Sequence, residues 1–110
     1  MVDIGKISIY IVGMNNVVEL KEDNLVDWLE NENLIAVFSS DSCTACKNLK
    51  PYLYELDEKY TVIIVDAVRH VRSSKFMAGG IQYYPTIGLF NRGYFIKELS
   101  QFDIIEKTID

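Results

Sequence analysis

The pattern of hydrophobic and polar residues along the chain predicts strands and helices in alternation. Residues 6–12 are rich in β-branched side chains and alternate with the period of a strand, and residues 17–20 predict a second, short strand. The continuous apolar runs at residues 34–38 and 61–65 are typical of strands that are covered on both faces. These four runs predict the first strands of a sheet.

The C-terminal part of the chain predicts a hairpin and a final helix. Residues 86–90 and 93–99 flank the turn sequence Asn-Arg-Gly, so we expect two antiparallel strands joined by a tight turn. Among the last residues, Phe102, Ile105 and Ile109 predict the buried face of a terminal helix.

Three more helices are predicted between the strands. Residues 22–33 begin with an Asp/Asn start signal, and Trp28 is expected to anchor their apolar face in the core. A longer helix is expected over residues 43–60, with a kink at Pro51, because proline removes a backbone donor. Residues 67–79 predict a third helix, which ends at a pair of glycines.

The order of the elements predicts an α/β fold, with a mixed central sheet and helices on both faces. The 110 residues, 49% of them hydrophobic, suit a single domain over residues 1–110. No repeat, charge block or long Pro, Gly or Ser tract divides the chain. Residues 1–15 are expected to hold an extra N-terminal strand.

The composition argues against a nucleic-acid surface. The chain has 16 Asp and Glu against 11 Lys and Arg, a net charge of −5, whereas nucleic-acid affinity depends on clustered cations. The apolar run at residues 7–12 is far shorter than the roughly 20 residues of a membrane-spanning helix. We therefore expect a cytoplasmic protein, a monomer or weak dimer, with neither a membrane nor a nucleic acid as partner. In a reducing cytoplasm, paired cysteines are more often catalytic or metal-binding than structural.

The two cysteines of the chain, Cys43 and Cys46, follow the apolar run at residues 34–38 in the sequence SCTACK. They therefore lie where a predicted strand ends and a helix begins, the place where open α/β sheets carry their chemistry. In the first helical turn, Cys43 faces unpaired N–H groups and the positive end of the helix dipole, which stabilise a thiolate. The spacing brings Cys46 to the same side of the turn, near enough for a disulfide. This arrangement favours a redox pair.

Two other interpretations of the cysteines stay open. A structural zinc site usually has four Cys or His ligands, and the chain offers only Cys43, Cys46 and His70, so such a site would need a dimer that shares ligands. We therefore expect no metal, and we expect His70 to be an exposed helix residue. The cysteines can also be two core residues that happen to lie close together.

Four features in a fixed order resemble the thioredoxin family. They are the C-x-x-C followed by Lys47, a proline at Pro51, the strand that ends in IIVD, and YYPTIGLF followed by a glycine turn. The upstream VVELKEDNLVDWL is similar to the first strand and helix of the family, so the resemblance extends from about residue 17 to the end. It implies a thioredoxin-like three-layer α/β/α fold. It also implies a thiol–disulfide oxidoreductase, without a cofactor, that acts on disulfide-containing protein substrates and needs a redox partner.

The resemblance also assigns roles to residues. Cys43 is expected to be the exposed nucleophile, which attacks as a thiolate, and Cys46 the buried thiol that resolves the mixed disulfide. Pro85 matches the cis-proline that lies against the dithiol, and the backbone of Tyr84 is expected to pair with substrate. The residues expected to bind substrate are Ser42, Thr44, Ala45, Tyr84 and Pro85.

Several positions depart from the family pattern. Val37 stands where thioredoxins carry a buried Asp that assists proton transfer, and Ser42 stands where Trp is usual. Thr44 and Ala45 replace Gly-Pro. Because such residues tune the reduction potential, the direction of electron transfer stays open. Asp41 is expected to cap the helix, although a carboxylate so close to the nucleophile would disfavour its thiolate.

A second class of function also stays open, a thioredoxin-like binding or assembly subunit whose dithiol is not catalytic. The extension at residues 1–15 favours this class, because an added strand can cover a sheet edge or pair with another chain. Tyr83 and Tyr84 either form an aromatic rim for a partner or pack near the start of a strand. Retention of both cysteines and of Pro85 favours the enzyme.

Overall fold

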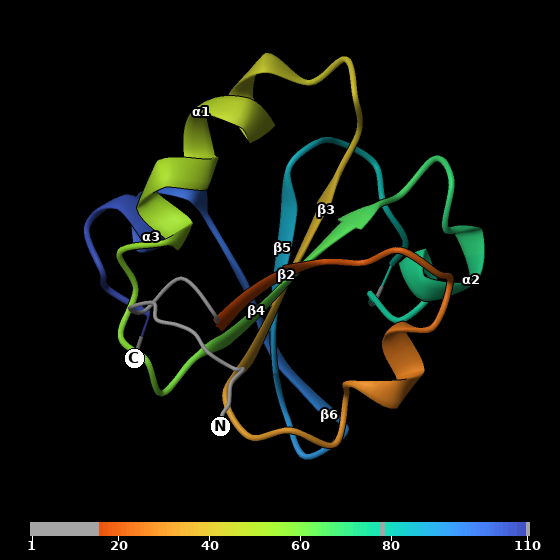
Figure 1. Ribbon diagram of the computed structural model, residues 1–110, viewed down its shortest axis with the longest axis horizontal. Coiled ribbons are helices and arrows are strands. Elements are labelled where there is room, and N and C mark those ends of the chain that lie inside the picture. Colours follow the sequence, from red (N-terminus) through yellow and green to blue (C-terminus); the bar gives the residue numbers. More distant parts are fainter. Residues whose placement is uncertain (1–15, 78, 110) are drawn as a thin grey trace, which may run out of the picture.

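The computed structural model describes residues 16–77 and 79–109 (Figure 1). The strand predicted near the N-terminus falls within residues 1–15 and lies outside the described residues. In the described part of the chain, no helix is long and apolar enough to cross a membrane.

A five-stranded mixed sheet forms the centre of the molecule, in the order β2-β4-β3-β5-β6. The strands are β2 (Val17–Glu19), β3 (Leu34–Ser39), β4 (Thr61–Asp66), β5 (Thr86–Asn91) and β6 (Tyr94–Leu99). Both β2 and β3 run parallel to β4, whereas β5 is antiparallel to β3 and β6 is antiparallel to β5. The prediction of an α/β fold with a mixed sheet is confirmed.

Helices cover both faces of the sheet, as Figure 1 shows. The helices α1 (Thr44–Leu53) and α3 (Gln101–Ile105) lie on one face. On the other face lie α2 (Val71–Ser74) and the short 3-10 helix η2 (Leu25–Asp27). These helices and the sheet form the three layers that the family resemblance implies.

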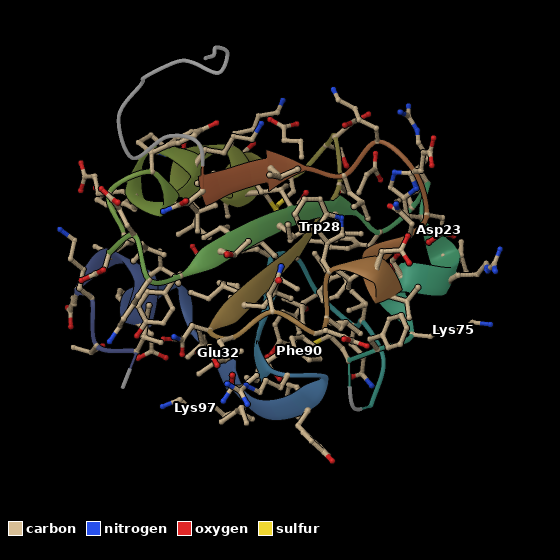
Figure 2. The ribbon with its side chains drawn as sticks, turned by 60° about the horizontal axis from the view of Figure 1, so that its bottom comes forward. Asp23, Trp28, Glu32, Lys75, Phe90 and Lys97 are labelled. Atoms are coloured by element: carbon tan, nitrogen blue, oxygen red, sulfur yellow. A yellow bond between two sulfur atoms is a disulfide. The ribbon has the colours of Figure 1, made fainter. Side chains whose placement is uncertain are left out.

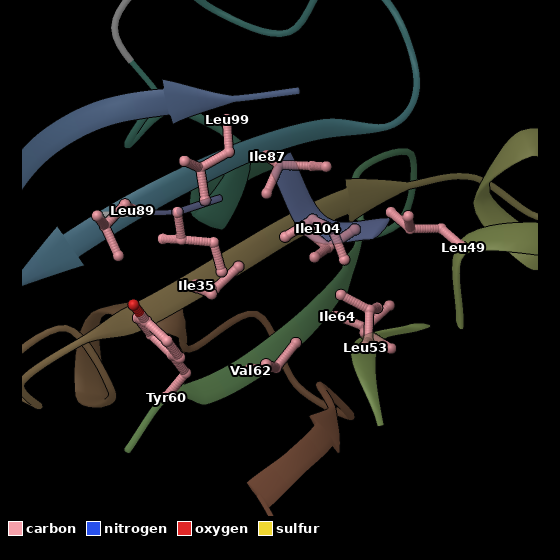
Figure 3. Close-up of a cluster of buried hydrophobic side chains, with 12 residues drawn as sticks. Ile35, Leu49, Leu53, Tyr60, Val62, Ile64, Ile87, Leu89, Leu99 and Ile104 are labelled. Atoms are coloured by element: carbon pink, nitrogen blue, oxygen red, sulfur yellow. The ribbon is translucent and has the colours of Figure 1, made fainter. Parts of the chain in front are cut away.

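Each face of the sheet has its own hydrophobic cluster, because successive residues of a strand point to opposite faces. In β3, Ile35 and Val37 belong to the cluster under α1 and α3, whereas Ala36 and Phe38 belong to the cluster under η2 and α2. Figure 3 shows the first cluster, which includes Ile35, Leu49, Leu53, Tyr60, Val62, Ile64, Ile87, Leu89, Leu99 and Ile104.

The helix predicted over residues 22–33 is reduced to η2 and the turns that follow it. The N–H of Trp28 donates to the carbonyl of Leu25 at 2.8 Å, and the N–H of Asn31 donates to the carbonyl of Trp28 at 3.1 Å. These are 3-10 bonds between residues three apart, and such helices rarely extend beyond one turn. Trp28 still packs against the second cluster, as the sequence predicts, although it is only half-buried.

Two other helices are also shorter than predicted. The chain leaves the α-helical pattern of α1 soon after Pro51, and the next N–H groups, of Glu55 and Leu56, bond to carbonyls three residues back. Before α2, a carboxylate oxygen of Asp66 accepts the N–H groups of Val68 and Arg69, both at 3.1 Å. Such bonds from a side chain to the backbone hold a turn and compete with helix formation.

The terminal helix α3 begins with a capping box. The hydroxyl of Ser100 accepts the N–H of Asp103 at 3.1 Å, and the carboxylate of Asp103 accepts the N–H of Ser100 at 2.9 Å. The hydrogen bond from the Ser100 N–H contributes most to holding the pKa of Asp103 below its ordinary value. The hydroxyl groups of Thr108 and Ser100 lower this pKa further. This end of the helix is therefore fixed by its own side chains.

The buried face predicted for α3 is wrong in part. Ile104 and Ile109 are buried, but Phe102 is 69% exposed and Ile105 is 38% exposed. The helix ends at Ile105, and Lys107 then adopts a positive φ of 59°, which turns the chain back toward the core. Ile109 is therefore buried from outside the helix, where the helical period no longer applies.

The predicted hairpin between β5 and β6 is confirmed. Arg92 and Gly93 both have positive φ, 51° and 87°, as a tight two-residue hairpin turn requires. The N–H groups of these two residues donate to the carbonyls of Asn31 and Leu29 at 3.0 and 2.6 Å. The turn is thus fastened to the segment that follows η2. Figure 2 shows Glu32 of that segment, whose carboxylate pairs with Arg92.

A single carboxylate joins the η2 segment to α2 (Figure 2). Asp23 accepts the N–H of Arg72 at 3.0 Å, the N–H of Ser73 at 2.7 Å and the hydroxyl of Ser73 at 2.6 Å. The same hydroxyl oxygen accepts the N–H of Leu25 at 3.1 Å. The hydroxyl of Ser73 contributes most to holding the pKa of Asp23 below its ordinary value.

We predict that Asp23→Asn lowers the urea midpoint of unfolding at neutral pH. The folded-state pKa of Asp23 lies below the unfolded value, so its stabilisation is fully present above the unfolded pKa, about 3.9. It is lost as the pH falls below that value toward the folded pKa. The difference between Asp23→Asn and the parent protein should therefore shrink in acid, measured by urea unfolding at several pH values.

Glu30→Gln, a change of the same kind at an exposed residue of the same segment, serves as the control and should leave the midpoint nearly unchanged. A difference for Asp23→Asn that persists unchanged in acid would show that the carboxylate charge is not what stabilises this contact.

Candidate functional site

The two cysteines lie between the end of β3 and the first turn of α1. Cys43 and Cys46 form a disulfide, with Cα atoms 5.3 Å apart. Cys43 is the N-cap of α1 and is partly exposed, whereas Cys46 lies in the first turn and is 7% exposed. The pairing predicted from the spacing is confirmed. Across residues 16–77 and 79–109, His, Cys, Asp and Glu side chains form no group of three or more that could hold a metal.

The helix cap is provided by Cys43 itself, and the prediction that Asp41 caps α1 is wrong. The Sγ of Cys43 accepts the N–H of Cys46 at 3.1 Å. Cys43 has the extended backbone of an N-cap residue, φ −90° and ψ 105°, so its side chain reaches the free N–H groups of the first turn. Asp41 lies two residues earlier and is exposed.

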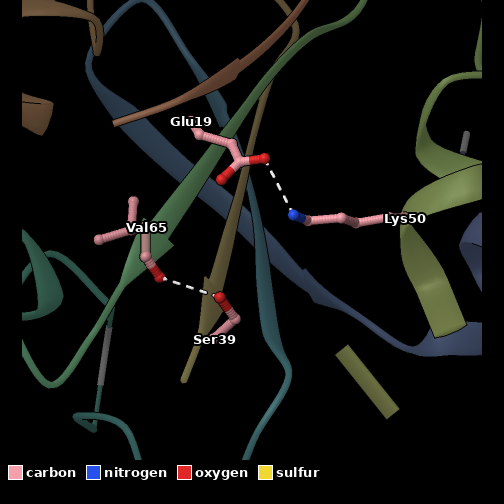
Figure 4. Close-up of polar contacts among 4 residues, drawn as sticks. All are labelled: Glu19, Ser39, Lys50 and Val65. Carbon is pink, nitrogen blue, oxygen red and sulfur yellow. Dashed lines mark hydrogen bonds and ion pairs between the residues drawn. The ribbon is translucent and has the colours of Figure 1, made fainter. Parts of the chain in front are cut away.

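A cavity of about 240 Å³ lies on the buried side of the dithiol. Val37 and Cys46 line it together with the polar residues Ser39, Asp66 and His70. Figure 4 shows two polar contacts in this region, the ion pair of Lys50 with Glu19 at 2.9 Å and the bond from the hydroxyl of Ser39 to the carbonyl of Val65 at 3.5 Å. Val37, which stands where the family carries a buried Asp, lines this cavity with an apolar side chain.

The expectation that His70 is exposed is wrong, because its side chain is only 5% exposed. The N–H of His70 donates to the carbonyl of Asp66 at 2.8 Å, so the chain after β4 turns back on itself. His70 becomes the N-cap residue of α2 and lines the cavity beside Cys46. Sequence reasoning missed this placement because it depends on the turn at Asp66 and not on the helical period.

The loop before β5 holds the predicted proline. The Tyr84–Pro85 peptide bond is cis, which confirms what the family resemblance implies. Thr86, the next residue, pairs with Phe38 of the antiparallel strand β3. Because β3 ends where β5 begins, Pro85 and the dithiol lie at the same end of the sheet.

Beside this loop lies a groove of about 520 Å³, here called the tyrosine groove. Its lining residues are Tyr83, Tyr84, Pro85, Glu98, Leu99, Ser100, Gln101 and Phe102. The hydroxyl of Tyr83 donates to the carboxylate of Glu98, and this bond raises the pKa of Tyr83 above its ordinary value. Tyr83 and Tyr84 are 57% and 38% exposed, which favours the aromatic rim over ordinary packing.

The remaining residues predicted to bind substrate surround Cys43 in the structure. Ser42 and Thr44 are exposed, and Ala45 is half-buried. Glu98 and Phe102, which line the tyrosine groove, were missed by sequence reasoning. They come from the end of β6 and the start of α3, and no motif in the sequence connects them with Tyr83 and Tyr84.

Comparison with known proteins gives the family. A family model described as Thioredoxin matches residues 16–108. The chain belongs to the thioredoxin family, and its fold together with the Cys43–Cys46 pair is that of a thiol–disulfide oxidoreductase. A search of curated proteins found no significant match.

Solved structures agree with this fold. The chain is 26% identical to a reduced Schistosoma mansoni thioredoxin pre-protein, with a TM-score of 0.65 over 84% of this chain and 98% of that one. It is 16% identical to thioredoxin f from spinach chloroplast, with a TM-score of 0.70 over 91% of this chain and 96% of that one. Human ERp44 in its zinc-bound form is 20% identical, with a TM-score of 0.65, and matches 83% of this chain but only 30% of its own.

We predict that neither cysteine of the purified oxidised protein reacts with iodoacetamide, because both sulfurs are in the disulfide. Mild reduction should add two hydrogens to the mass, after which Cys43 should be alkylated before Cys46, since it is the more exposed sulfur. Mass spectrometry of the intact protein and its peptides measures both. A stoichiometric metal with no mass change on reduction would contradict this prediction.

Proposed function

We propose that the chain exchanges disulfides with protein substrates, with Cys43 as the nucleophile and Cys46 as the resolving thiol. The observation that supports this division of roles is the unequal exposure of the two cysteines at the start of α1. A substrate disulfide can approach a partly exposed cysteine at the N-cap, whereas a buried cysteine such as Cys46, which is 7% exposed, is suited to reaction within the molecule.

The reaction takes two exchange steps. The thiolate of Cys43 attacks one sulfur of the substrate disulfide, so that a mixed disulfide forms and the other substrate sulfur leaves as a thiolate. Cys46 then loses its proton and attacks the Sγ of Cys43, which restores the internal disulfide and releases the second substrate thiolate. The substrate has gained two electrons and the protein has lost two. A redox partner must reduce the Cys43–Cys46 disulfide for the next cycle, and the reverse sequence oxidises a substrate dithiol.

The residues around the dithiol form the proposed substrate-binding surface. Ser42, Thr44 and Ala45 flank the nucleophile, and Tyr84 and Pro85 lie at the same end of the sheet. An extended substrate segment would pair with the backbone of Tyr84 as an added strand does. The cytoplasmic location and the monomeric or weakly dimeric state stay predictions, as does the single domain over residues 1–110.

We predict that Cys46→Ser accumulates covalent mixed disulfides with protein substrates. Attack at Cys43 remains possible in this variant, but the resolving thiol is gone. The adducts should be visible on a non-reducing gel of a cell extract and should disappear after reduction. Cys43→Ser is the matched control and should capture little.

Both variants should lose disulfide reductase activity toward a model protein such as insulin, while their far-UV circular dichroism stays unchanged. If Cys46→Ser captures nothing and the parent protein reduces no disulfide, the chain is instead a binding or assembly subunit with a non-catalytic dithiol.

We predict that Val37→Asp accelerates release of the mixed disulfide near neutral pH. Val37 lines the cavity with Cys46, so an aspartate there would supply a proton acceptor beside the resolving thiol. In the parent protein, release should quicken as the pH rises, because more of the Cys46 thiol is then ionised. In Val37→Asp, release should be faster by up to about 100-fold and less dependent on pH. Stopped-flow measurement of thiol release from a chromogenic disulfide follows this step.

Val37→Asn is the control, because asparagine has the shape of aspartate and is buried at the same position, but it cannot accept the proton of Cys46. Equal release rates for Val37→Asp and Val37→Asn would show that another group already serves as the base for Cys46.

A further inference from the structure

The tyrosine groove extends the proposed substrate-binding surface away from the cysteines. Its lining includes Pro85, which lies at the same end of the sheet as the dithiol, Glu98 at the end of β6 and Phe102 in the first turn of α3. Phe102 is 69% exposed and Tyr83 is 57% exposed. Large aromatic side chains left exposed around one groove mark a binding surface.

Among the described residues that line this groove, Glu98 is the one with a formal charge. The carboxylate accepts the hydroxyl of Tyr83, and an ionised carboxylate has about four acceptor positions, so it can bind a further donor. A tyrosine is neutral near pH 7, since its ordinary pKa is about 10, so Tyr83 does not repel Glu98.

The charged neighbours Asp103 and Lys97 are not among the residues that line the groove. Asp103 accepts the N–H of Ser100 and the hydroxyl of Thr108, and both bonds belong to the ends of α3. Lys97 precedes Glu98 on β6, where successive side chains point to opposite faces, and its charge lowers the pKa of Asp103. Glu98 therefore sets the sign of the charge that the groove presents.

We infer that the tyrosine groove binds a cationic side chain, arginine or lysine, of the substrate segment beside the disulfide under attack. The carboxylate of Glu98 would accept a charge-assisted hydrogen bond from the cation. The exposed rings of Tyr83, Tyr84 and Phe102 offer the aromatic faces on which guanidinium and ammonium groups pack. An acidic side chain would instead be repelled by the carboxylate of Glu98 and by the net charge of −5 on the chain.

This inference rests on the proposed function, because the groove selects substrates only if Cys43 attacks them. The experiment uses the pre-reduced full-length protein and three synthetic peptides, each with one internal disulfide. The peptides differ only at one position near the disulfide, which is arginine, leucine or glutamate. The second-order rate constant of a single exchange is measured by acid quenching and mass spectrometry.

The arginine peptide should react roughly threefold to tenfold faster than the leucine peptide, and the glutamate peptide should react slowest. Glu98→Gln should abolish most of the difference in rate constant between the arginine peptide and the leucine peptide. Glutamine keeps the shape of the side chain and an acceptor for Tyr83. The matched control is Glu106→Gln, which removes the same charge at the end of α3, outside the groove, and should keep the preference for arginine.

Equal rates for the three peptides would overturn this inference and leave the proposed function standing. An equal loss of preference in Glu98→Gln and Glu106→Gln would also overturn it, because net charge and not the groove would then select the substrate. If no peptide is reduced, the proposed function fails and this inference fails with it.

Discussion

The position of β3 between β4 and β5 is the constraint on which the rest of the site depends. Phe38 pairs with Thr86 in antiparallel register, and Ser39 pairs with Asp66 in parallel register. The end of β3, the start of β5 and the end of β4 therefore meet at one end of the sheet. This brings together the dithiol, the cis-proline and the turn before α2. A slip of one residue would move every side chain of β3 to the other face, so the two buried clusters hold this register.

The same alternation explains the chemistry on the buried side of the dithiol. Val37 lies two residues after Ile35 on β3, so it points to the same face of the sheet, toward the cluster under α1. This direction also brings it to the cavity that Cys46 lines. A carboxylate at this position could accept a proton but would have to be buried, since Val37 is only 2% exposed. Valine removes that cost and contributes to the core. Under the proposed function, another group would have to accept the proton of Cys46.

Within residues 16–77 and 79–109, sequence patterns predicted the strands and the dithiol well. These depend on local properties, namely continuous apolar runs and the spacing of two cysteines at a helix start. The same patterns overestimated the helices, because contacts between side chains and backbone decide where helices begin. Asp66 closes a turn ahead of α2, and Asp23 binds the backbone of that helix from 50 residues away along the chain. The burial of His70 and the presence of Glu98 in the tyrosine groove likewise follow from tertiary folding, which no single-sequence pattern contains.

The redox centre and the tyrosine groove are built from different elements of the fold. The two sulfurs are positioned by the junction of β3 and α1, whereas the tyrosine groove is built by the loop before β5, the end of β6 and the start of α3. The pairing of β3 with β5 connects the two parts through the sheet, and α1 also contacts α3 on one face of it. Residues such as Glu98 can therefore change without moving Cys43 or its helix cap. Under the inference made above, changes in the groove alone would alter which substrates the same redox centre accepts.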